Sequence, residues 1–462
     1  MACLLYTSSP RRSLNRADCF RLFNKSEKTH CRFSIPPLSP PIGGRMEIIM
    51  KKLLSALTAV VIALSFCSCG ILRPLGQSDT DTAAPDAAQT SAVPDSAQGT
   101  GESGGSSTDT KEIEAEEKRL SFVGCGDNIV YYGNVREAAA VAQPGGRQYN
   151  FAPTYSQVAP IVSAADISFI NQETLMAGEG WDFSYYPTFN GPQDMGRDLV
   201  DLGYDVVSIA NNHMLDKGGA GLEATIKFWK SMNVLMIGGY ESEDDYNAVR
   251  ILEKDGVKIA FLSYTYGTNG ITLGSGYNVV IPYLDEATVK SQIETARTQA
   301  DFVFVSAHWG IEDHFTPSDE QKKYARIMAD AGADVILGHH PHVIQPVEWI
   351  SAEDGRKTLC VYSLGNFMAE QAYDYNMIGG MISFDIVTKG DTRSIENPVF
   401  IPTVYYFDTS FYGNCIYLLE TFTAAQAASH GIAAYGHYTN LETLRKYVTD
   451  TVSPEFLPES FK

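Results

Sequence analysis

Five short apolar runs in this chain each end on side chains of the kind that bind metals. The runs end at Asp127, Glu173, His213, His308 and His342. A run of four to six β-branched or aromatic residues is typical of a strand that is buried on both faces. In an open α/β sheet, ligands bind beyond the carboxyl ends of such strands. We therefore expect these five ends to converge on one site, although they lie far apart in the sequence.

Helical patterns separate the predicted strands. Apolar residues recur at helical spacing in residues 156–165, 192–203, 221–232, 286–300 and 318–332, and an apolar run follows each of these segments. This repetition predicts an α/β domain over residues 119–410 with mostly parallel central strands. Four later apolar runs (343–350, 358–365, 380–387 and 400–406) have no helices between them. They indicate a second sheet packed on the first, and residues 411–462 are predicted to extend the domain with one or two helices.

Residues 50–69 have the features of a bacterial export signal. Two lysines follow Met50, an apolar stretch runs from Leu53 to Phe66, and small residues precede Cys69. The apolar stretch is shorter than the roughly 20 residues of a membrane-spanning helix. A cysteine at this place predicts a lipoprotein that is lipidated on Cys69 and attached to the outer side of a bacterial membrane. Plain secretion and a retained anchor are the alternatives.

The segments on either side of this signal carry no predicted fold. Residues 1–49 are basic and lack sustained periodicity, so we interpret them as a misassigned upstream segment, with translation starting at Met50 or Met46. Residues 70–118 are rich in Ser, Thr, Asp, Ala, Gly and Pro. A segment with so few large apolar residues cannot offset its ordering entropy. We therefore predict a disordered linker between the membrane and the domain.

Charge and cysteine usage exclude some classes of function. The formal net charge is −20, which argues against a nucleic-acid partner, because phosphate contacts need basic surface. Only Cys125, Cys360 and Cys415 fall in the predicted domain. Three widely spaced cysteines are a poor disulfide framework, so we expect buried thiols.

The first two strand ends carry carboxylates. Asp127 follows a glycine that permits a tight turn, and Glu173 lies two residues after Asn171 on the same side of an extended segment. Both can coordinate a cation. Asp127 can instead cap the next turn, and Glu173 can be an ordinary polar strand end.

The sequence NNHMLDKG (211–218) is more specific. Asn212 offers an amide oxygen to a metal, and His213 offers an imidazole suited to proton transfer. Asp216, three residues later, can orient that imidazole. A structural histidine without a chemical role is the alternative.

Two further segments supply most of the histidines. In HWGIEDH, His308 directly follows an apolar run, Glu312 can accept a hydrogen bond from a ligating histidine, and His314 is expected to be a solvated loop residue. In GHHPH (338–342), an extended loop would point His340 and His342 to one side.

Two more residues rank below these as candidate metal ligands. His339 would point away from its neighbours, so it is ranked as a residue of the cleft before it is ranked as a ligand. Asn366, in SLGNF (363–367), can line the cleft or close the sheet.

A ligand set that mixes carboxylate, amide oxygen and imidazole favours Zn, Mn or Fe over Ca or Mg. Two such ions close together activate water and stabilise an oxyanion. The sequence therefore predicts one or two divalent ions at this site.

In this order, the motifs GD, NxE, NNHxxDxG, HWGxE, GHHPHVxQ and SLGNF resemble the CapA (poly-γ-glutamate capsule-synthesis) family, a branch of the calcineurin-like metallophosphatase superfamily. The resemblance covers about residues 120–410 and implies a four-layer α/β/β/α sandwich. It implies that His213 is the acid that protonates the leaving group. It also implies a set of metal ligands: Asp127, Glu173, Asn212, His308, His340 and His342. The Asp-x-His that opens the superfamily pattern is absent, which leaves open whether two ions, one ion or none binds tightly.

The resemblance implies a cell-surface protein of capsule biosynthesis or export, and three roles are compatible with it. The first is a metal-dependent hydrolase or transferase that acts on a phosphoester or a γ-glutamyl amide. The second is an accessory protein for assembling, exporting or anchoring an anionic capsular polymer, alongside polymer-synthesis or export proteins. The third is a secreted nucleotidase. Because the predicted domain is acidic, we expect any binding of an anionic polymer to depend on divalent metal.

Overall fold

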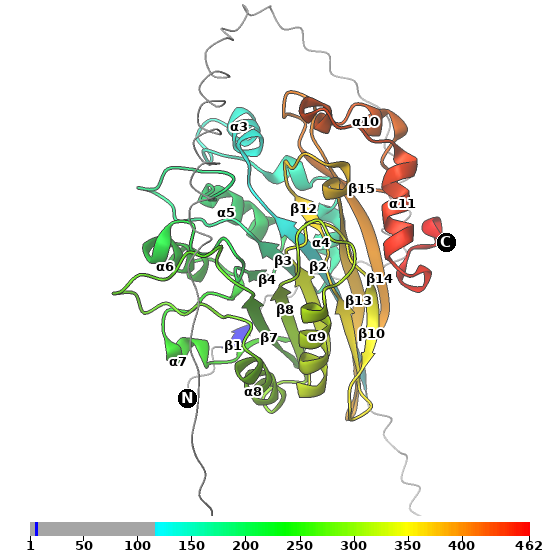
Figure 1. The fold of residues 1–462 in the computed structure, drawn as a ribbon. Coiled ribbons are helices and arrows are strands. Elements are labelled where there is room, and N and C mark those ends of the chain that lie inside the picture. Colours follow the sequence, from blue (N-terminus) through cyan, green and yellow to red (C-terminus); the bar gives the residue numbers. More distant parts are fainter. Residues whose placement is uncertain (1–4, 8–115) are drawn as a thin grey trace, which may run out of the picture. The chain divides into compact units, whose positions relative to one another are not determined.

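Two β-sheets packed face to face form the centre of the protein (Figure 1). The computed structural model describes residues 5–7 and 116–462. The predictions for the export signal, for Cys69 and for most of the segments 1–49 and 70–118 lie outside these residues. The strand β2 begins at Glu117, just before the predicted start of the domain.

The first sheet has the order β1-β6-β7-β8-β9-β11-β10 in the described part of the chain. Its strands are β1 (Leu5–Thr7), β6 (Arg250–Lys254), β7 (Val257–Thr265), β8 (Phe302–His308), β9 (Val335–His339), β11 (Lys357–Val361) and β10 (Val347–Ser351). The central strands β7, β8, β9 and β11 are parallel. The strands β6 and β10 pair antiparallel to their neighbours β7 and β11.

The second sheet has the order β15-β14-β13-β2-β3-β4-β5, with β12 paired to β2, within the same described ranges. Its strands are β15 (Cys415–Leu418), β14 (Thr392–Tyr406), β13 (Ile378–Lys389), β2 (Glu117–Asn128), β3 (Ile167–Gln172), β4 (Val206–Ser208), β5 (Leu235–Ile237) and β12 (Asn366–Met368). The strands from β2 to β5 are parallel, and β13, β14 and β15 form antiparallel pairs. A second sheet is therefore confirmed, but only two of the four runs predicted to form it, 380–387 and 400–406, lie in it. The runs 343–350 and 358–365 instead supply β10 and β11 of the first sheet, because β11 pairs parallel to β9.

Helices cover the outer faces of both sheets. On the first sheet lie α8 (Glu286–Arg297) and α9 (Asp319–Ala331), whose apolar side chains share a core with Val303 and Val305 of β8. The second sheet is covered by α4 (Ala159–Ala164), α5 (Gln193–Leu202), α6 (Gly218–Lys230) and α11 (Leu441–Thr451). The expected four-layer α/β/β/α order is confirmed.

The alternation of side chains along β8 explains why the two sheets pack. Phe302 and Phe304 face the second sheet, while the valines between them face the helices. Phe304 lies 5.3 Å from Phe122 of β2 and 5.7 Å from Phe384 of β13, measured between ring centroids. Each such buried ring contributes about 2–3 kcal/mol of transfer free energy.

The remaining helices are short. They are α3 (Tyr132–Ala140), α7 (Glu243–Tyr246), α10 (Ala424–Ala428) and the 3-10 turns η2 (Ala152–Tyr155), η3 (Asp374–Met377), η4 (Gly431–Tyr435), η5 (Pro454–Phe456) and η6 (Glu459–Phe461). Among the described residues, no helix has both the length and the apolar character needed to span a membrane. Cys125, Cys360 and Cys415 are buried free thiols, as expected.

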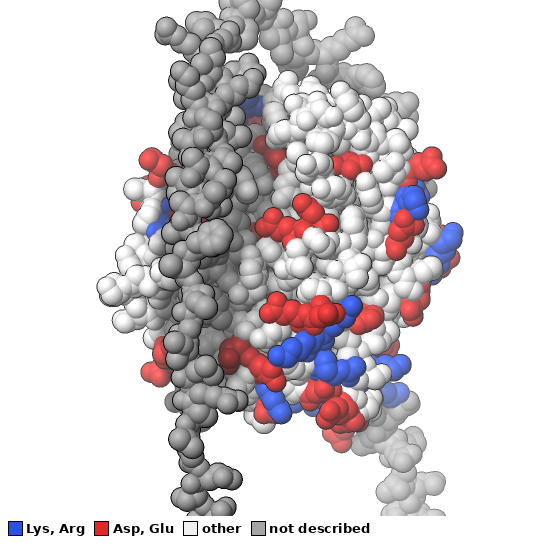
Figure 2. Space-filling view, viewed as in Figure 1, with Lys and Arg blue, Asp and Glu red and all other residues white. Residues whose placement is uncertain are grey.

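The parallel strands of both sheets end at the same side of the molecule, which we call the carboxyl edge; the opposite side is the amino edge (Figure 1). Charge divides these edges. On the face drawn in Figure 2, lysines and arginines gather over α8 and α9 towards the amino edge and on α11, while the upper part is mainly uncharged with separate acidic patches.

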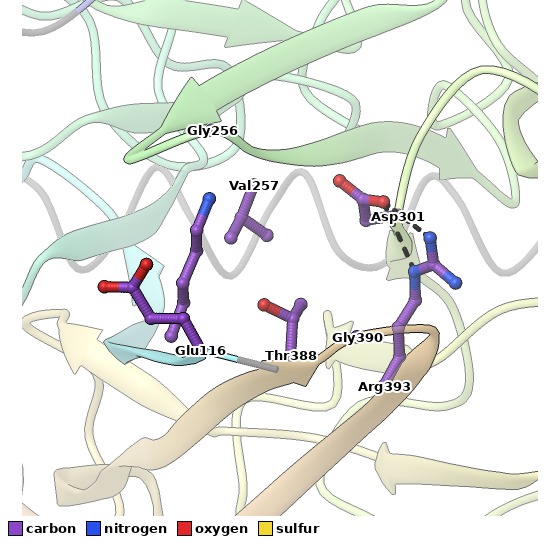
Figure 3. A pocket seen from close by; sticks show the side chains of 8 residues that line it. Glu116, Gly256, Val257, Asp301, Thr388, Gly390 and Arg393 are labelled. Atoms are coloured by element: carbon purple, nitrogen blue, oxygen red, sulfur yellow. Dashed lines mark hydrogen bonds and ion pairs between the residues drawn. The ribbon is translucent and has the colours of Figure 1, made fainter. Parts of the chain in front are cut away.

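A pocket of about 290 Å³ opens at the amino edge between turns of the two sheets (Figure 3). Both of its basic side chains are already engaged. Arg393 lies 2.8 Å from Asp301, and Lys118 donates to the carbonyl oxygen of Asp255 at 3.0 Å. The pocket is remote from the strand ends that carry the predicted ligands, so the functional site is sought at the carboxyl edge.

Candidate metal centre

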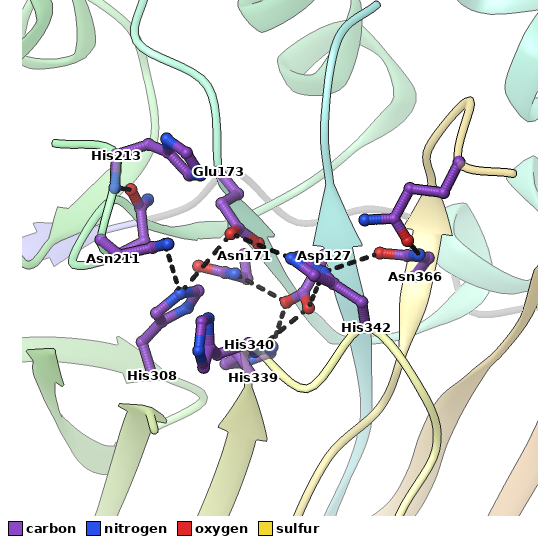
Figure 4. Close-up of polar contacts among 12 residues, drawn as sticks. Asp127, Asn171, Glu173, Asn211, His213, His308, His339, His340, His342 and Asn366 are labelled. Atoms are coloured by element: carbon purple, nitrogen blue, oxygen red, sulfur yellow. Dashed lines mark hydrogen bonds and ion pairs between the residues drawn. The ribbon is translucent and has the colours of Figure 1, made fainter. Parts of the chain in front are cut away.

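The carboxyl edge gathers the side chains that were predicted to converge (Figure 4). Each comes from the end of a different strand: Asp127 from β2, Glu173 after β3, Asn212 and His213 after β4, His308 from β8, His339, His340 and His342 at and after β9, and Asn366 from β12. All of these side chains are buried.

Asp127 lies at the centre of this group. The chain approaches closely here, because a Cβ on Gly126 would lie 2.1 Å from the carbonyl oxygen of Gly365. The Asp127 carboxylate accepts hydrogen bonds from the Asn171 amide at 2.8 Å and from the backbone N–H of His340 at 3.1 Å. Burial raises the pKa of Asp127, but His339 and His342 outweigh burial and hold the pKa well below its usual range. Asp127 is therefore an anion.

Glu173 has the opposite environment. It is 0% exposed, and neither carboxylate oxygen has a hydrogen-bond partner. Its nearest ionisable neighbours are His308 Nε2 at 3.5 Å and His342 Nε2 at 3.8 Å, both measured to Oε1. Burial raises the pKa of Glu173 well above its usual range. A nearby cation would reverse this shift by stabilising the carboxylate.

Two histidines are held in the neutral form that binds metals. Burial lowers the pKa of His308 well below its usual range and lowers the pKa of His340 to about 3. The two ring centroids lie 4.9 Å apart. His308 Nε2 is 2.9 Å from the amide oxygen of Asn212, which joins the β4 and β8 ends. Neutral imidazole is the ligating form.

His342 behaves differently from these two histidines. Burial alone would lower the pKa of His342, but Glu173 and Asp127 outweigh burial and raise it to about 10. Its Nδ1 lies 3.4 Å from Asp127 and 3.0 Å from the amide oxygen of Asn366. The His342 ring thus lies between two buried acidic groups, Asp127 and Glu173, at a place where a metal ion would also meet both.

The GHHPH loop is not extended, which corrects one expectation. His340 has φ 98° and His342 has φ 57°, both in the left-handed region. This backbone turns back on itself, so His339 does not point away from the group. Its Nδ1 lies 3.2 Å from Asp127 Oδ1. Left-handed conformations cost non-glycine residues about 1–3 kcal/mol and are found mostly at functional sites.

His213 and Asp216 form a pair beside the cluster. His213 Nδ1 lies 2.7 Å from Asp216, which also accepts the backbone N–H of Phe189 at 2.6 Å. The Phe189 ring packs edge-on against the imidazole at 4.7 Å. These contacts fix the orientation of the His213 ring.

The unpartnered atoms provide a test of whether a metal fits. Besides Glu173, His308 Nδ1, His340 Nδ1 and both ring nitrogens of His339 are buried without a hydrogen-bond partner. Three groups of residues each bring ligand atoms within 4.8 Å of one another: Glu173–His308–His340, Asp127–Glu173–His342 and Glu312–His340–His342. Buried polar atoms are rarely left unpaired. Carboxylates and imidazoles left in this state fit a divalent cation.

Two predicted residues remain, Glu312 and His314, and both are exposed. Glu312 is exposed, but it reaches the histidines as a member of the third group. His314 is exposed, as expected.

Two residues of the site were missed in the sequence. Tyr266, at the end of β7, lies parallel to the His308 ring (9° between planes) and 4.6 Å from His340. Asn269 accepts a hydrogen bond from Asn212 at 3.2 Å. The sequence does contain a pattern that could have indicated them, because AFLSYTYG is also an apolar run that ends on polar residues. An aromatic residue at such a place is more often part of a core.

The chain matches a known family over most of its described part. Residues 119–371 match the family described as bacterial capsule synthesis protein PGA_cap. The PGA biosynthesis protein CapA of Bacillus subtilis (strain 168) is 33% identical over 203 residues, 44% of this chain and 52% of the relative. The capsule biosynthesis protein CapA of Bacillus anthracis is 31% identical over 196 residues, 42% and 46% of the two chains. The chain thus spans about half the length of these curated relatives.

Solved structures with a related arrangement are more distant. The 5'-nucleotidase precursor from Thermus thermophilus has 15% identity and a TM-score of 0.38, covering 72% of this chain and 59% of that chain. A calcineurin-like phosphoesterase from Bacillus subtilis has 13% identity and a TM-score of 0.35, covering 72% and 97%.

Proposed function

The chain belongs to the PGA_cap family of bacterial capsule synthesis proteins, and from this premise we propose that it acts in making a poly-γ-glutamate-type capsular polymer as a metal-dependent hydrolase or transferase. The substrate class that fits is a phosphoester or a γ-glutamyl amide. The names of the two CapA relatives support the capsule context.

The observation that carries the proposal is the buried carboxylate of Glu173 with no partner for either oxygen. A buried carboxylate whose oxygens accept no hydrogen bond costs several kcal/mol, unless it takes up a proton or binds a cation. Side chains that can ligate a metal surround the same space. The ligands would be Asp127, Glu173, His308, His340 and His342, with Asn212 and Glu312 beside them. Nitrogen-rich sets of this kind favour Mn, Zn or Fe.

A bound divalent ion would activate water and stabilise a developing oxyanion. The chain's own part in the chemistry is proton transfer by His213. Because Asp216 engages Nδ1, the proton passes through Nε2 to the leaving group. Phe189 packs against the imidazole, and the Asn211 side-chain oxygen accepts a hydrogen bond from the backbone N–H of His213.

Metal content combined with a substrate screen tests this proposal. We expect the purified chain to bind divalent metal in a form detectable by mass spectrometry, and to hydrolyse a phosphoester or a γ-glutamyl peptide only when that metal is present. Glu173→Gln should lose metal and activity together, whereas Asp301→Asn at the amino edge should keep both. A chain that holds no metal and is inert on both substrate classes would contradict an enzymatic role and favour the accessory one.

The acidic surface gives a second test of the capsule context. The connections at the carboxyl edge carry many carboxylates, so poly-γ-glutamate would be repelled unless a bound cation reverses the local field. We expect the chain to retain poly-γ-glutamate in the presence of divalent metal and to release it on adding chelator. Equal retention in both conditions would contradict metal-mediated binding.

The proposed location is the outer side of a bacterial membrane, with the chain attached through a lipid on Cys69. The signal-like sequence of residues 50–69 supports this. Incorporation of labelled palmitate in cells should be lost in Cys69→Ala. Labelling that persists in that variant would contradict lipidation at this cysteine.

A further inference from the structure

The exposed apolar side chains of this protein gather at one edge. Every strongly exposed large apolar residue of the described chain lies on a segment beyond the carboxyl edge: Tyr132, Val141, Tyr186, Tyr266, Tyr283, Ile311, Tyr373, Tyr412, Tyr435 and Tyr438. Eight of these ten are tyrosines. Scattered exposed apolar residues need no explanation, but such a concentration of one residue type marks a contact surface.

Four of these exposed tyrosines and two partly buried ones form an arc, which we call the tyrosine arc: Tyr132, Tyr373, Tyr412 and Tyr435, with Tyr185 and Tyr375. Aromatic contacts connect its members. Tyr132 meets Tyr185 at 5.8 Å and Tyr373 stacks on Tyr375 at 5.1 Å, with ring planes 8° apart. The Arg136 guanidinium lies over both Tyr132 and Tyr412, and Phe411 contacts Tyr435 at 5.6 Å.

Both ends of the tyrosine arc reach the metal centre. At one end, Tyr131 packs on Phe189, the ring that contacts His213. At the other end, Asn376 follows Tyr375 and donates a hydrogen bond to the backbone carbonyl of His342 at 3.3 Å. A chain-like ligand lying along the arc would therefore pass the candidate centre.

Positive charge is nearly absent beside the arc. Between the carboxyl ends of β2, β3, β4, β5, β7, β8, β9, β12 and β14 and the next helix or strand, the connections contain one lysine, Lys217, and no arginine. Arg136, on α3, is engaged, because it donates to the carbonyl oxygens of Ser410 and Phe411. These connections thus offer a single cationic group, Lys217, which is too little positive charge to hold an anionic polymer along the arc.

We propose that the tyrosine arc binds an uncharged sugar chain. Tyrosine rings present flat apolar faces with a hydroxyl at one end and lose little entropy on binding, which suits the C–H faces and hydroxyls of a sugar. Carboxylates on the same connections accept hydrogen bonds from sugar hydroxyls, and the missing cations favour a ligand without negative charge. This proposal goes beyond the metal-dependent role, because the arc binds its ligand without metal.

Binding to neutral oligosaccharides, measured by calorimetry on the full chain in the presence of EDTA, tests the proposal. Cellohexaose and chitohexaose are the probes, and tetralysine, poly-γ-glutamate and phospholipid vesicles are run in parallel. We expect at least one hexasaccharide to bind in EDTA. Since metal is removed, failure of the proposed metal function would leave this result unchanged. Binding of only tetralysine or only vesicles would overturn the proposal in favour of a cationic ligand or a membrane surface, and binding of no hexasaccharide would overturn it outright.

Matched variants locate the binding. Tyr132→Ala and Tyr373→Ala should each weaken sugar binding by about 3- to 10-fold, which is the range expected for loss of one aromatic contact. Tyr132→Phe and Tyr373→Phe keep the ring and should stay near wild type, which separates loss of stacking from misfolding. Lys323→Ala, on the exposed face of α9, is the remote control. Sugar affinity that is unchanged in both alanine variants would overturn the assignment to the arc.

Discussion

The two edges of the sheets use the same residue types for opposite purposes. At the amino edge, an aspartate precedes each of four parallel strands and accepts a backbone N–H from the neighbouring strand. The pairs are Asp166 with Ser121, Asp205 with Ser168, Asp301 with Lys258 and Asp334 with Val303, at 2.7–3.0 Å. At the carboxyl edge, Glu173 accepts nothing.

This difference separates stability from function. More than half of the buried side-chain atoms without a partner in the described chain belong to residues at the carboxyl edge. The four aspartates of the amino edge find their hydrogen-bond donors within the protein, and so they need no ligand. The carboxyl edge leaves ligand atoms free and holds two histidines in left-handed backbone, which is the pattern of a site prepared for a bound cation.

The largest effect should come from removing a ligand at the carboxyl edge. We expect His340→Ala to weaken divalent-metal binding by more than about 100-fold, since even an outer contact is worth 10- to 100-fold. Competition with a metal indicator dye measures this affinity. Wild-type affinity in the variant would remove His340 from the ligand set.

One carboxylate from each edge, Glu370 and Asp301, should respond to pH with opposite sign. Burial raises the pKa of Glu370 from 4.5 to about 7 against backbone hydrogen bonds from Gly133 and Asn134. The folded state then holds a proton that the unfolded state has lost, so the free energy of unfolding falls as pH rises from about 4.5 through 7, by about 3 kcal/mol. In urea unfolding with chelator, the slope between about pH 4.5 and 7 should be less negative in Glu370→Gln than in the wild type, and the slope that remains belongs to the other buried groups of the carboxyl edge.

Asp301 provides the contrast for that measurement. Burial raises the pKa of Asp301, but the backbone N–H of Lys258 and the Arg393 guanidinium outweigh burial and lower it. Its contribution to stability is present at neutral pH and is lost as pH falls through its folded-state pKa. A variant Asp301→Asn that altered the slope between about pH 4.5 and 7 would contradict this division.

An intermediate effect on stability should follow from replacing one of the amino-edge aspartates. Asp334→Ala leaves the N–H of Val303 and the partly buried Arg297 without their acceptor. We expect a loss of about 1–3 kcal/mol in the free energy of unfolding, with metal affinity unchanged. Calorimetric melting and metal titration of the same variant check both parts. A change in metal affinity would show that the edges are coupled.

The smallest effect should come from an outer contact of the metal centre. The Asn366 amide oxygen lies 3.0 Å from His342 Nδ1, and its amide nitrogen donates to Gln371 and to the backbone of Asn376. Asn366→Ala should weaken metal binding by about 10-fold with a small change in stability. A loss as large as that of His340→Ala would instead make Asn366 a direct ligand.

The sequence predicted the layers and the convergence because both follow from strand periodicity. Runs such as FVFVSAH have alternating faces, and parallel strands bring their ends to one edge whatever the spacing between them. The ends of two helices also follow from local residues. Pro192 and Gly203 flank α5, and the structure shows that Ser318 forms a capping box with Gln321 at the start of α9.

Backbone reversals and surface contacts were not accessible in the same way. An extended GHHPH loop would send His339 away from the group, whereas the left-handed angles at His340 and His342 depend on packing that no local pattern encodes. Tyr266 was not selected from the sequence, and the tyrosine arc joins segments more than 200 residues apart. Only tertiary structure brings these rings together.

The left-handed backbone at His340 has a consequence for how variants of this protein would be selected. Glycine adopts φ 98° without strain, so His340→Gly should relax the fold even as it deletes a ligand. In a library screened separately for abundance in cells and for capsule phenotype, position 340 should rank glycine highly in the first screen and among the worst in the second. Homologues that have lost the chemistry would then be recognisable by glycine at this position.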